Sequence, residues 1–187
     1  MNQPTPPSAL LVPNPPGGPS ASGLLQSLQA VGVTHAVTVP DFVQFALHER
    51  IFEKASGIQS VLACAEDQAL TTATGLYIGG AKPFLMVQNQ GMFKVANTLR
   101  ATCLDAGIPM VFFVGQFGRE ASNVGHTMAE SGRSMVRLME PMLHGMGVKT
   151  WVVEDDADLP RVAEAFAHAR DAETAAVVLI GRHVTWN

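Results

Sequence analysis

Cysteine, charge and long hydrophobic runs are all scarce in this chain of 187 residues. The two cysteines, Cys64 and Cys103, lie 39 positions apart and match neither a zinc-site spacing nor a disulfide framework, so we expect two reduced, buried thiols. Charged residues make up only 15% of the sequence, and 12 basic against 16 acidic side chains give a net charge of −4. The absence of a basic stripe argues against a nucleic-acid partner, and the low charge fraction suggests a surface partly covered by another subunit.

Segments that would direct the chain to a membrane are also missing. No apolar run reaches the ~18 residues that a membrane-spanning helix needs. The first basic residue is Arg50, whereas signal and transit peptides carry positive charge close to their start. The sequence therefore predicts a cytoplasmic protein without a membrane partner.

Proline, by contrast, is concentrated at the start of the chain. Seven of the 12 prolines lie within residues 1–20, a composition that holds neither a helix nor a sheet ladder. We interpret residues 1–20 as a flexible, partly polyproline tail, either a dispensable extension or a docking arm. Residues 21–187 form one domain in this interpretation, and a hydrophobic content of 47% is enough for a sizeable core.

Helix and strand patterns alternate after residue 21. The expected strands span residues 35–39, 58–64, 84–88, 108–115, 149–153 and 175–180. The expected helices span residues 22–30, 42–54, 66–78, 92–104, 135–146 and 157–170. Such alternation is typical of right-handed crossovers. We therefore predict an α/β fold with three layers, in which a doubly wound sheet of six parallel strands has helices on both faces. The polar residues 116–133 are expected to form a mobile loop.

Ligands of such sheets bind at the carboxyl ends of the strands. The turn after the first strand reads VPDFVQ, and the motifs GxGxxG, GxxxxGK[ST] and GxSxG are absent. The strand ends carry instead two carboxylates and four amides: Asp41, Glu66, Gln88, Asn89, Gln90 and Gln116. These groups suit hydrogen bonding to a neutral heterocycle and proton transfer, and they do not suit phosphate binding or tight metal chelation.

Three segments together resemble a known family. They read GVTHAVTVPDF, VLACAEDQALTTATGLYIGGAKP and VQNQGMFKVANTLRATCLDAGIPMVFFVGQFG. In this order and spacing they resemble the pyrimidine-binding domain of thiamine-diphosphate enzymes, from about Val33 to Val153, or about two thirds of the chain. Within that family the sequence is most similar to the alpha subunit of sulfopyruvate decarboxylase and to the matching half of phosphonopyruvate decarboxylase.

The resemblance implies catalytic roles for Glu66 and Asp41. Glu66 would hydrogen-bond N1′ of the cofactor's aminopyrimidine and favour the imino tautomer, whose 4′-nitrogen then acts as a base. Asp41 would handle a proton after carbon dioxide leaves. From the residues alone, Glu66 is also readable as a first-turn helix carboxylate and Asp41 as a helix cap.

The resemblance further implies that Asn89, Gln90 and Gly91 bind the cofactor together with Glu66. Gln88, Gln116 and Arg119 would bind the substrate. From the residues alone, the amides before Gly91 are also readable as turn formers, and Arg119 as a solvated loop residue. His126 in the polar loop is an acid–base candidate of lower weight.

The family holds the diphosphate of its cofactor through Mg²⁺, using a GDG motif followed further along by an Asn. This sequence contains no GDG. The resemblance therefore implies that this chain binds only the pyrimidine end of thiamine diphosphate. A separate diphosphate-binding beta subunit with the GDG and Asn motif would hold the Mg²⁺, in a hetero-oligomer such as α2β2 or larger.

The function implied is that of the alpha subunit of a heteromeric thiamine-diphosphate-dependent 2-oxo acid decarboxylase, which is non-oxidative and gives an aldehyde and carbon dioxide. A carboligase subunit and a non-catalytic subunit that binds or stabilises the cofactor remain alternatives. A sulfonate or phosphonate substrate would call for clustered cations, and only Arg119, Arg133 and Lys94 are candidates. Phe42 and Phe93 leave room for a more apolar substrate.

Overall fold

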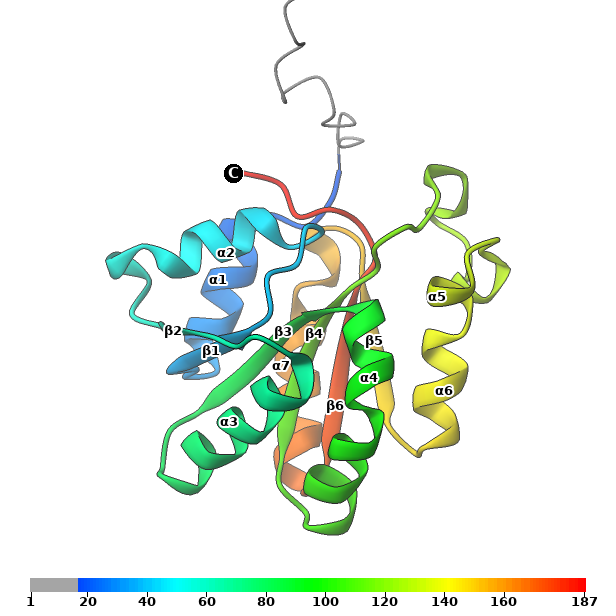
Figure 1. Cartoon of the computed structure of the whole chain (residues 1–187). Helices are drawn as coiled ribbons and strands as arrows, with labels where there is room; N and C mark the ends of the chain where they lie inside the picture. The colour runs from blue at the N-terminus through cyan, green and yellow to red at the C-terminus, as the bar shows by residue number, and fades with distance from the viewer. Residues whose placement is uncertain (1–16) are drawn as a thin grey trace, which may run out of the picture.

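The computed structural model describes residues 17–187, so most of the predicted tail, residues 1–16, lies outside the described part. Six parallel strands form one sheet in the order β2-β1-β3-β4-β6-β5, with helices on both faces (Figure 1). The strands are β1 (His35–Thr38), β2 (Gln59–Leu62), β3 (Pro83–Gln88), β4 (Met110–Gly115), β5 (Lys149–Val153) and β6 (Ala175–Ile180). The predicted three-layer α/β fold is confirmed.

Strand position in the sheet follows from hydrophobicity. Every residue of β4 and of β6 is buried, and their sequences MVFFVG and AAVVLI contain no polar side chain. Such uninterrupted runs are typical of parallel strands covered on both faces. The edge strand β2 reads QSVL and is partly exposed along its whole length. Cys64, just after this strand, is exposed, so the prediction of a buried thiol is wrong there, whereas Cys103 is buried as predicted.

One hydrophobic cluster fills each face of the sheet. The first face is covered by α1 (Ala21–Ala30), α2 (Phe45–Phe52) and α7 (Pro160–Asp171), and the second by α3 (Glu66–Ile78), α4 (Asn89–Leu99), α5 (Ser134–Arg137) and α6 (Met139–Gly145). Strand β3 shows the division, since Phe84 and Met86 belong to the first cluster and Leu85 and Val87 to the second. Successive side chains of a strand point to opposite faces, which produces this alternation.

Two predicted helices are shorter or broken for local reasons. The helix predicted at 42–54 begins only at Phe45, because the backbone N–H of Val43 donates to the Asp41 carboxylate and shapes a turn before it. The helix predicted at 135–146 is divided into α5 and α6. Pro141 lacks the N–H that would continue a single helix across this point.

Two other predicted segments differ in shape. The helix predicted at 92–104 begins earlier, at Asn89, and its last turns from Arg100 to Asp105 form a π-helix. The polar segment 116–133, predicted to be a mobile loop, contains two 3₁₀ turns, Ala121–Asn123 and Met128–Glu130. Its mobility stays a prediction.

The two ends of the described chain are joined. The Thr185 N–H donates to the Pro19 carbonyl at 2.9 Å, and the Ala21 N–H donates to the Thr185 carbonyl at 3.0 Å. The Ser20 side chain caps α1 by accepting from the Gly23 N–H at 3.1 Å. The last residues of the predicted tail, Pro19 and Ser20, are therefore hydrogen-bonded into the domain.

The sheet has a topological switch point between β1 and β3. From β1 the chain passes to β2 on one side, and it returns to β3 on the other side of β1. The loops after β1, β3 and β4 gather at the upper edge in Figure 1, together with α2 and the C-terminal segment. This is the edge at which doubly wound sheets bind ligands. Within residues 17–187, no helix is long and apolar enough to cross a membrane.

Candidate functional site

Glu66 stands at the start of α3, directly after the edge strand β2, and its side chain is half-buried. It lies against Gly91 in the first turn of α4. A Cβ at position 91 would fall 2.3 Å from Cγ, Cδ and Oε1 of Glu66, so a side chain there would displace the carboxyl group. We call this contact the open seat, because the carboxylate keeps part of its surface exposed.

Asp41 lies in the turn after β1 and is 1% exposed. Its Oδ2 rests against Gly115 at the end of β4, where a Cβ would fall only 1.8 Å away. Oδ1 accepts from the Val43 N–H at 2.9 Å, and Oδ2 accepts from Nε2 of Gln44 at 2.7 Å. We call this contact the closed seat. The cap of α2 is Gln44, so Asp41 shapes the turn before the helix and does not cap it.

Burial raises the pKa of Asp41 from 3.8 to about 6. Hydrogen bonds from the side chain of Gln44, the backbone of Val43 and the side chain of Gln88 act in the opposite direction and lower it. The net result is a carboxyl group that exchanges its proton close to neutral pH. Such a group suits general acid and base chemistry.

His48 on α2 holds the backbone at Asp41. The Asp41 N–H donates to Nε2 of His48 at 3.2 Å, so this nitrogen is an acceptor and the ring proton lies on Nδ1. Burial lowers the pKa of His48 to about 4, so the ring is neutral at pH 7. The ring also stacks on Phe52 with centroids 6.4 Å apart.

Of the three amides at and after the end of β3, Gln88 and Asn89 contact other parts of the protein and Gln90 is exposed. Gln88 is half-buried and acts on Asp41, while Asn89 is fully buried. Asn89 donates through Nδ2 to the Phe117 carbonyl at 3.0 Å and accepts from the Gln90 N–H at 2.9 Å. Asn89 therefore fixes the loop after β4. Gln90 is exposed and is the member of this group most free to meet a ligand.

Gln116 follows β4 and is 3% exposed. Its Nε2 donates to the Val114 carbonyl at 3.2 Å, whereas its Oε1 is buried and has no hydrogen-bond partner among the residues that the structure describes. Leaving a buried acceptor unsatisfied costs about 1–3 kcal/mol. An N–H donor brought by a ligand, or a water molecule, would satisfy it.

Arg119 is committed inside the protein. Its guanidinium donates to two carbonyls and a side chain within its own loop, to Glu154, and to the Gly181 carbonyl at 3.2 Å, so all five N–H groups are used. The side chain is only 3% exposed. Arg119 therefore organises the segment 116–133 and has no N–H left for a substrate. Lys94, another cation near the edge, pairs with Asp67 at 3.3 Å.

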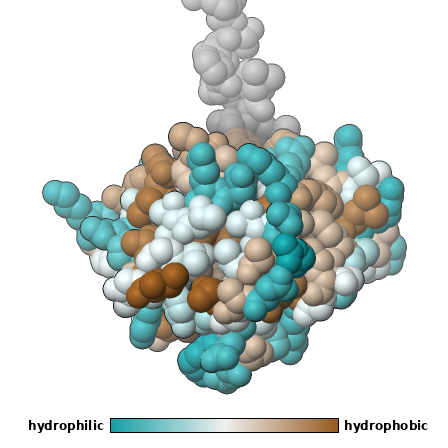
Figure 2. All heavy atoms as spheres, turned by 60° about the horizontal axis from the view of Figure 1, so that its bottom comes forward, coloured by the Kyte–Doolittle hydropathy of each residue, from teal (hydrophilic) through white to brown (hydrophobic). Residues whose placement is uncertain are grey.

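The remaining candidate, His126, lies away from both seats. It is exposed, stands 3.8 Å from Glu130, and lines a polar cavity of about 200 Å³ within the segment 116–133. A larger, mainly apolar cavity of about 620 Å³ lies at the opposite end of the sheet, beside Pro83, Met110 and Phe166. Figure 2 turns that end forward and shows hydrophobic patches among hydrophilic ones. Neither Glu66 nor Asp41 lines either of these two cavities.

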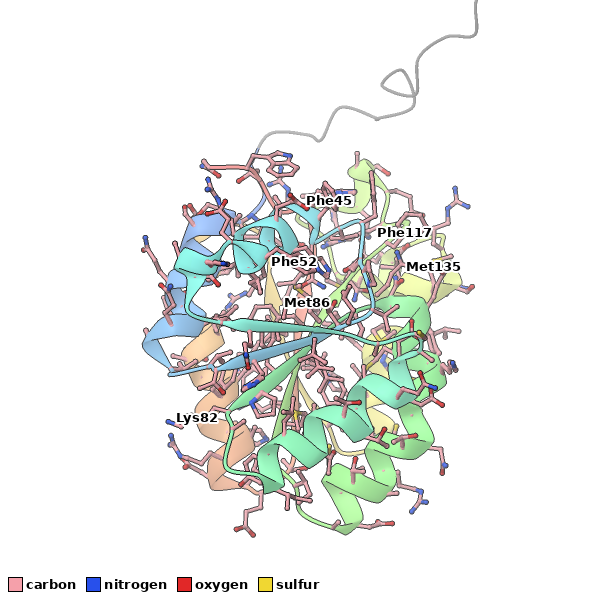
Figure 3. All side chains as sticks on the ribbon, turned by 60° about the vertical axis from the view of Figure 1, so that its left-hand side comes forward. Phe45, Phe52, Lys82, Met86, Phe117 and Met135 are labelled. Atoms are coloured by element: carbon pink, nitrogen blue, oxygen red, sulfur yellow. The ribbon has the colours of Figure 1, made fainter. Side chains whose placement is uncertain are left out.

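Aromatic side chains surround this edge. Phe42, Phe45 and Phe117 are 51%, 49% and 38% exposed, and Trp186 is 59% exposed. Phe45 packs edge-on against Trp186 with centroids 5.6 Å apart. Figure 3 shows Phe45 and Phe117 at this end of the molecule and Lys82 at the other. These side chains leave apolar surface exposed around the edge.

Sequence reasoning missed three residues of the closed seat: Gln44, His48 and Gly115. Gln44 and His48 fall in a helix whose pattern was interpreted only as an apolar stripe with a polar face. The only signal was that both are polar and follow Asp41 by three and seven positions, on the same side of α2 as the turn. Gly115 ends a long apolar run, and nothing local shows that Asp41 rests on it.

The residues at this edge fit the pyrimidine end of thiamine diphosphate. A half-buried carboxylate on the open seat and the unsatisfied acceptor of Gln116 provide partners for a heterocycle with ring nitrogens and an amino group. In the described part of the chain, no group of three or more His, Cys, Asp or Glu side chains could hold a metal ion.

No protein-family model matches the sequence, and no curated protein matches it. Among solved structures, the chain is similar to the 2-oxoglutarate:ferredoxin oxidoreductase from Magnetococcus marinus with 2-oxoglutarate, coenzyme A and succinyl-CoA bound. The TM-score is 0.61 at 13% identity, over 85% of this chain and 28% of that chain. This likeness shows that the two chains share a fold over that range.

Proposed function

We propose that this chain is the pyrimidine-binding subunit of a heteromeric, thiamine-diphosphate-dependent enzyme that decarboxylates a 2-oxo acid without oxidation, giving an aldehyde and carbon dioxide. The observation that carries the proposal is the pair of carboxylates on glycine seats. Glu66 and Asp41 follow β2 and β1, on one side of the β1–β3 switch point. The glycines that they contact, Gly91 and Gly115, lie just after β3 and at the end of β4, on the other side.

Each carboxylate has a separate task in this proposal. When bound, thiamine diphosphate supplies the electron sink that decarboxylation of a 2-oxo acid requires. Glu66, held against Gly91 with part of its surface open, donates a proton at N1′ of the pyrimidine. Asp41, with a pKa of about 6, holds or releases a proton on the substrate side. Gln90 and Gln116 contribute uncharged hydrogen-bonding groups.

The diphosphate and its Mg²⁺ belong to a partner chain in this proposal. The sequence contains no GDG motif, and this edge offers aromatic side chains where a diphosphate site would need donors and cations. Exposed Phe42, Phe45 and Trp186 form an apolar rim that a partner subunit would cover. The similar solved chain is about three times as long, and this one covers 28% of it, which agrees with a domain that works beside others.

An apolar substituent on the 2-oxo acid suits the edge better than a sulfonate or phosphonate. Of the three candidate cations, Arg119 has no N–H to spare, Lys94 is paired with Asp67, and Arg133 is exposed in the segment 116–133. Phe42 and Phe117 are instead available around the edge. The similar solved structure has 2-oxoglutarate bound, which is a substrate of the same 2-oxo acid class.

The replacement Glu66→Gln tests the proposal. The chain is purified with a partner chain that carries the GDG motif, and aldehyde and carbon dioxide are measured across a panel of alkyl and aryl 2-oxo acids. Because an amide is a much weaker proton donor, we expect the rate to fall at least about 100-fold, the scale of a lost general acid. Glu49→Gln, an exposed position on α2, is the matched control and should leave the rate unchanged.

The other outcomes separate the alternatives. Activity that survives Glu66→Gln nearly intact would favour a non-catalytic subunit. A 2-hydroxy ketone in place of the aldehyde would favour a carboligase.

A further inference from the structure

We propose that Gln44 is a positioning residue, which clamps the Asp41 carboxyl group to the ends of β3 and β4 and holds it in one orientation for proton transfer. This inference rests on the proposed function. Gln44 is fully buried, and its Nε2 lies 2.7 Å from Oδ2 of Asp41, 3.3 Å from the Val87 carbonyl and 3.2 Å from the Phe113 carbonyl. One side chain thus joins the turn after β1 to two neighbouring strands.

The carbonyl oxygen of the Gln44 amide has no hydrogen-bond partner in the described part of the chain, which indicates that the residue acts through its Nε2 donor. Oε1 of Gln44 is buried and has no partner among the residues described, which costs about 1–3 kcal/mol. The neighbouring positions Val43, Ala46 and Leu47 are buried and apolar, so Met or Leu would fill the space without that cost. A buried amide kept despite an unsatisfied acceptor is typical of a functional position.

The amide also acts selectively on the charged form of Asp41. A primary amide has two N–H groups, and three acceptors surround this one. The carboxylate is the strongest of the three acceptors when it is charged, because hydrogen bonds to ionised groups are the stronger ones. The clamp therefore opposes burial and keeps the proton affinity of Asp41 within reach of neutral pH.

Few other groups compete for control of Asp41. From α2, the neutral ring of His48 accepts from the Asp41 backbone N–H. From the C-terminal segment, His183 packs against the ring of Phe42 with centroids 5.5 Å apart. Strands β3 and β4 contribute only an amide, Gln88, and a glycine.

The test is the pKa of Asp41 in the full chain, measured by NMR with ¹³C-labelled aspartate side chains. Gln44→Met removes the N–H donors and keeps the volume, so we expect the titration midpoint of Asp41 to rise by about one pH unit or more. Gln44→Glu places a second carboxyl beside it and should split the titration into two coupled steps. Gln29→Met removes a similar side-chain bond, to the Ser56 carbonyl, and should leave the midpoint unchanged.

Kinetics of the same variants with the partner chain complete the test. We expect Gln44→Met to lower kcat about tenfold or more with KM almost unchanged, and to move the pH–rate profile upward by the shift that NMR records. A midpoint of Asp41 that stays fixed in both Gln44 variants overturns the inference. A pH–rate profile that stays unchanged although the titration midpoint of Asp41 has shifted also overturns the inference. If the wild-type complex forms no aldehyde, the proposed function fails, and the NMR titration still decides whether Gln44 sets the proton affinity of Asp41.

Discussion

Glu66 and Asp41 each rest on a glycine of a neighbouring element, yet the open seat and the closed seat are built differently. Glu66 keeps part of its surface exposed, and its seat is formed by Gly91 on the first turn of α4. Asp41 is 1% exposed and takes hydrogen bonds from Val43 and Gln44. The open seat suits direct contact with a ligand, whereas the closed seat suits a group whose proton affinity the protein itself must control.

Gly115→Ala gives the largest expected effect on stability. The new Cβ would fall 1.8 Å from Oδ2 of Asp41 and 2.9 Å from Cβ of Val43. Neither neighbour is free to move, because Asp41 is buried and doubly hydrogen-bonded. We expect the free energy of unfolding to fall by about 3 kcal/mol, the upper range for overpacking, as measured by urea denaturation. Gly145→Ala, where nothing lies within 4 Å, is the control. An equally small change in both variants would show that the closed seat is not rigid.

The pH dependence of stability tests the chemistry of the closed seat. The pKa of Asp41 is raised to about 6, so its contribution to stability is fully present below pH 3.8 and is lost as the pH rises through about 6. The pKa of His48 is lowered to about 4, so its contribution is present above pH 6.5 and is lost as the pH falls through about 4. The two groups therefore oppose each other over the same range and partly cancel.

Single replacements should reveal each half of this balance. As the pH rises from 4 to 6, the free energy of unfolding of Asp41→Asn should increase relative to that of wild type by up to about 3 kcal/mol. As the pH rises from 4 to 6.5, the free energy of unfolding of His48→Gln should decrease relative to that of wild type by up to about 3 kcal/mol. The slope against pH is the measurement, because the absolute stability also includes the contact of the new Asn with the Gln44 amide. Parallel curves for wild type and both variants would contradict the assigned proton affinities.

Much of the sheet was predictable because its signals are local. The strands at 149–153 and 175–180 and the helix at 66–78 have the predicted bounds, since each is a run of one periodicity between turn residues. Glu66 was predictable at its strand end for the same reason. The closed seat was not, because Gly115 and Asp41 are far apart in sequence and only the packing of β4 beside the turn brings them together.

Arg119 is a second case in which the sequence does not show the tertiary contacts of a residue. Its position after β4 made it a candidate for an anionic substrate. Its acceptors come from its own loop, from Glu154 and from Gly181, and no local pattern indicates that these would surround it. The position of an Arg or Lys after a strand predicts that it lies near the site. Only the tertiary structure shows whether its N–H groups already donate to other residues.

Gly91→Ala gives the smallest expected effect on stability and tests the open seat. The new Cβ would fall 2.3 Å from the Glu66 carboxyl, but this side chain is only half-buried and can rotate toward solvent. Replacing a helical glycine by alanine also favours the helix by about 1 kcal/mol, so we expect the free energy of unfolding to change by at most about 1 kcal/mol. Gly75→Ala on α3, where nothing lies within 4 Å, should be stabilised by a similar amount and keep full activity. Gly91→Ala should instead lose at least about 100-fold in decarboxylation rate with its partner chain, because the general acid has left its place. A stable and fully active Gly91→Ala enzyme would mean that Glu66 acts equally well away from Gly91, and the distinction between the two seats would then lose its functional meaning.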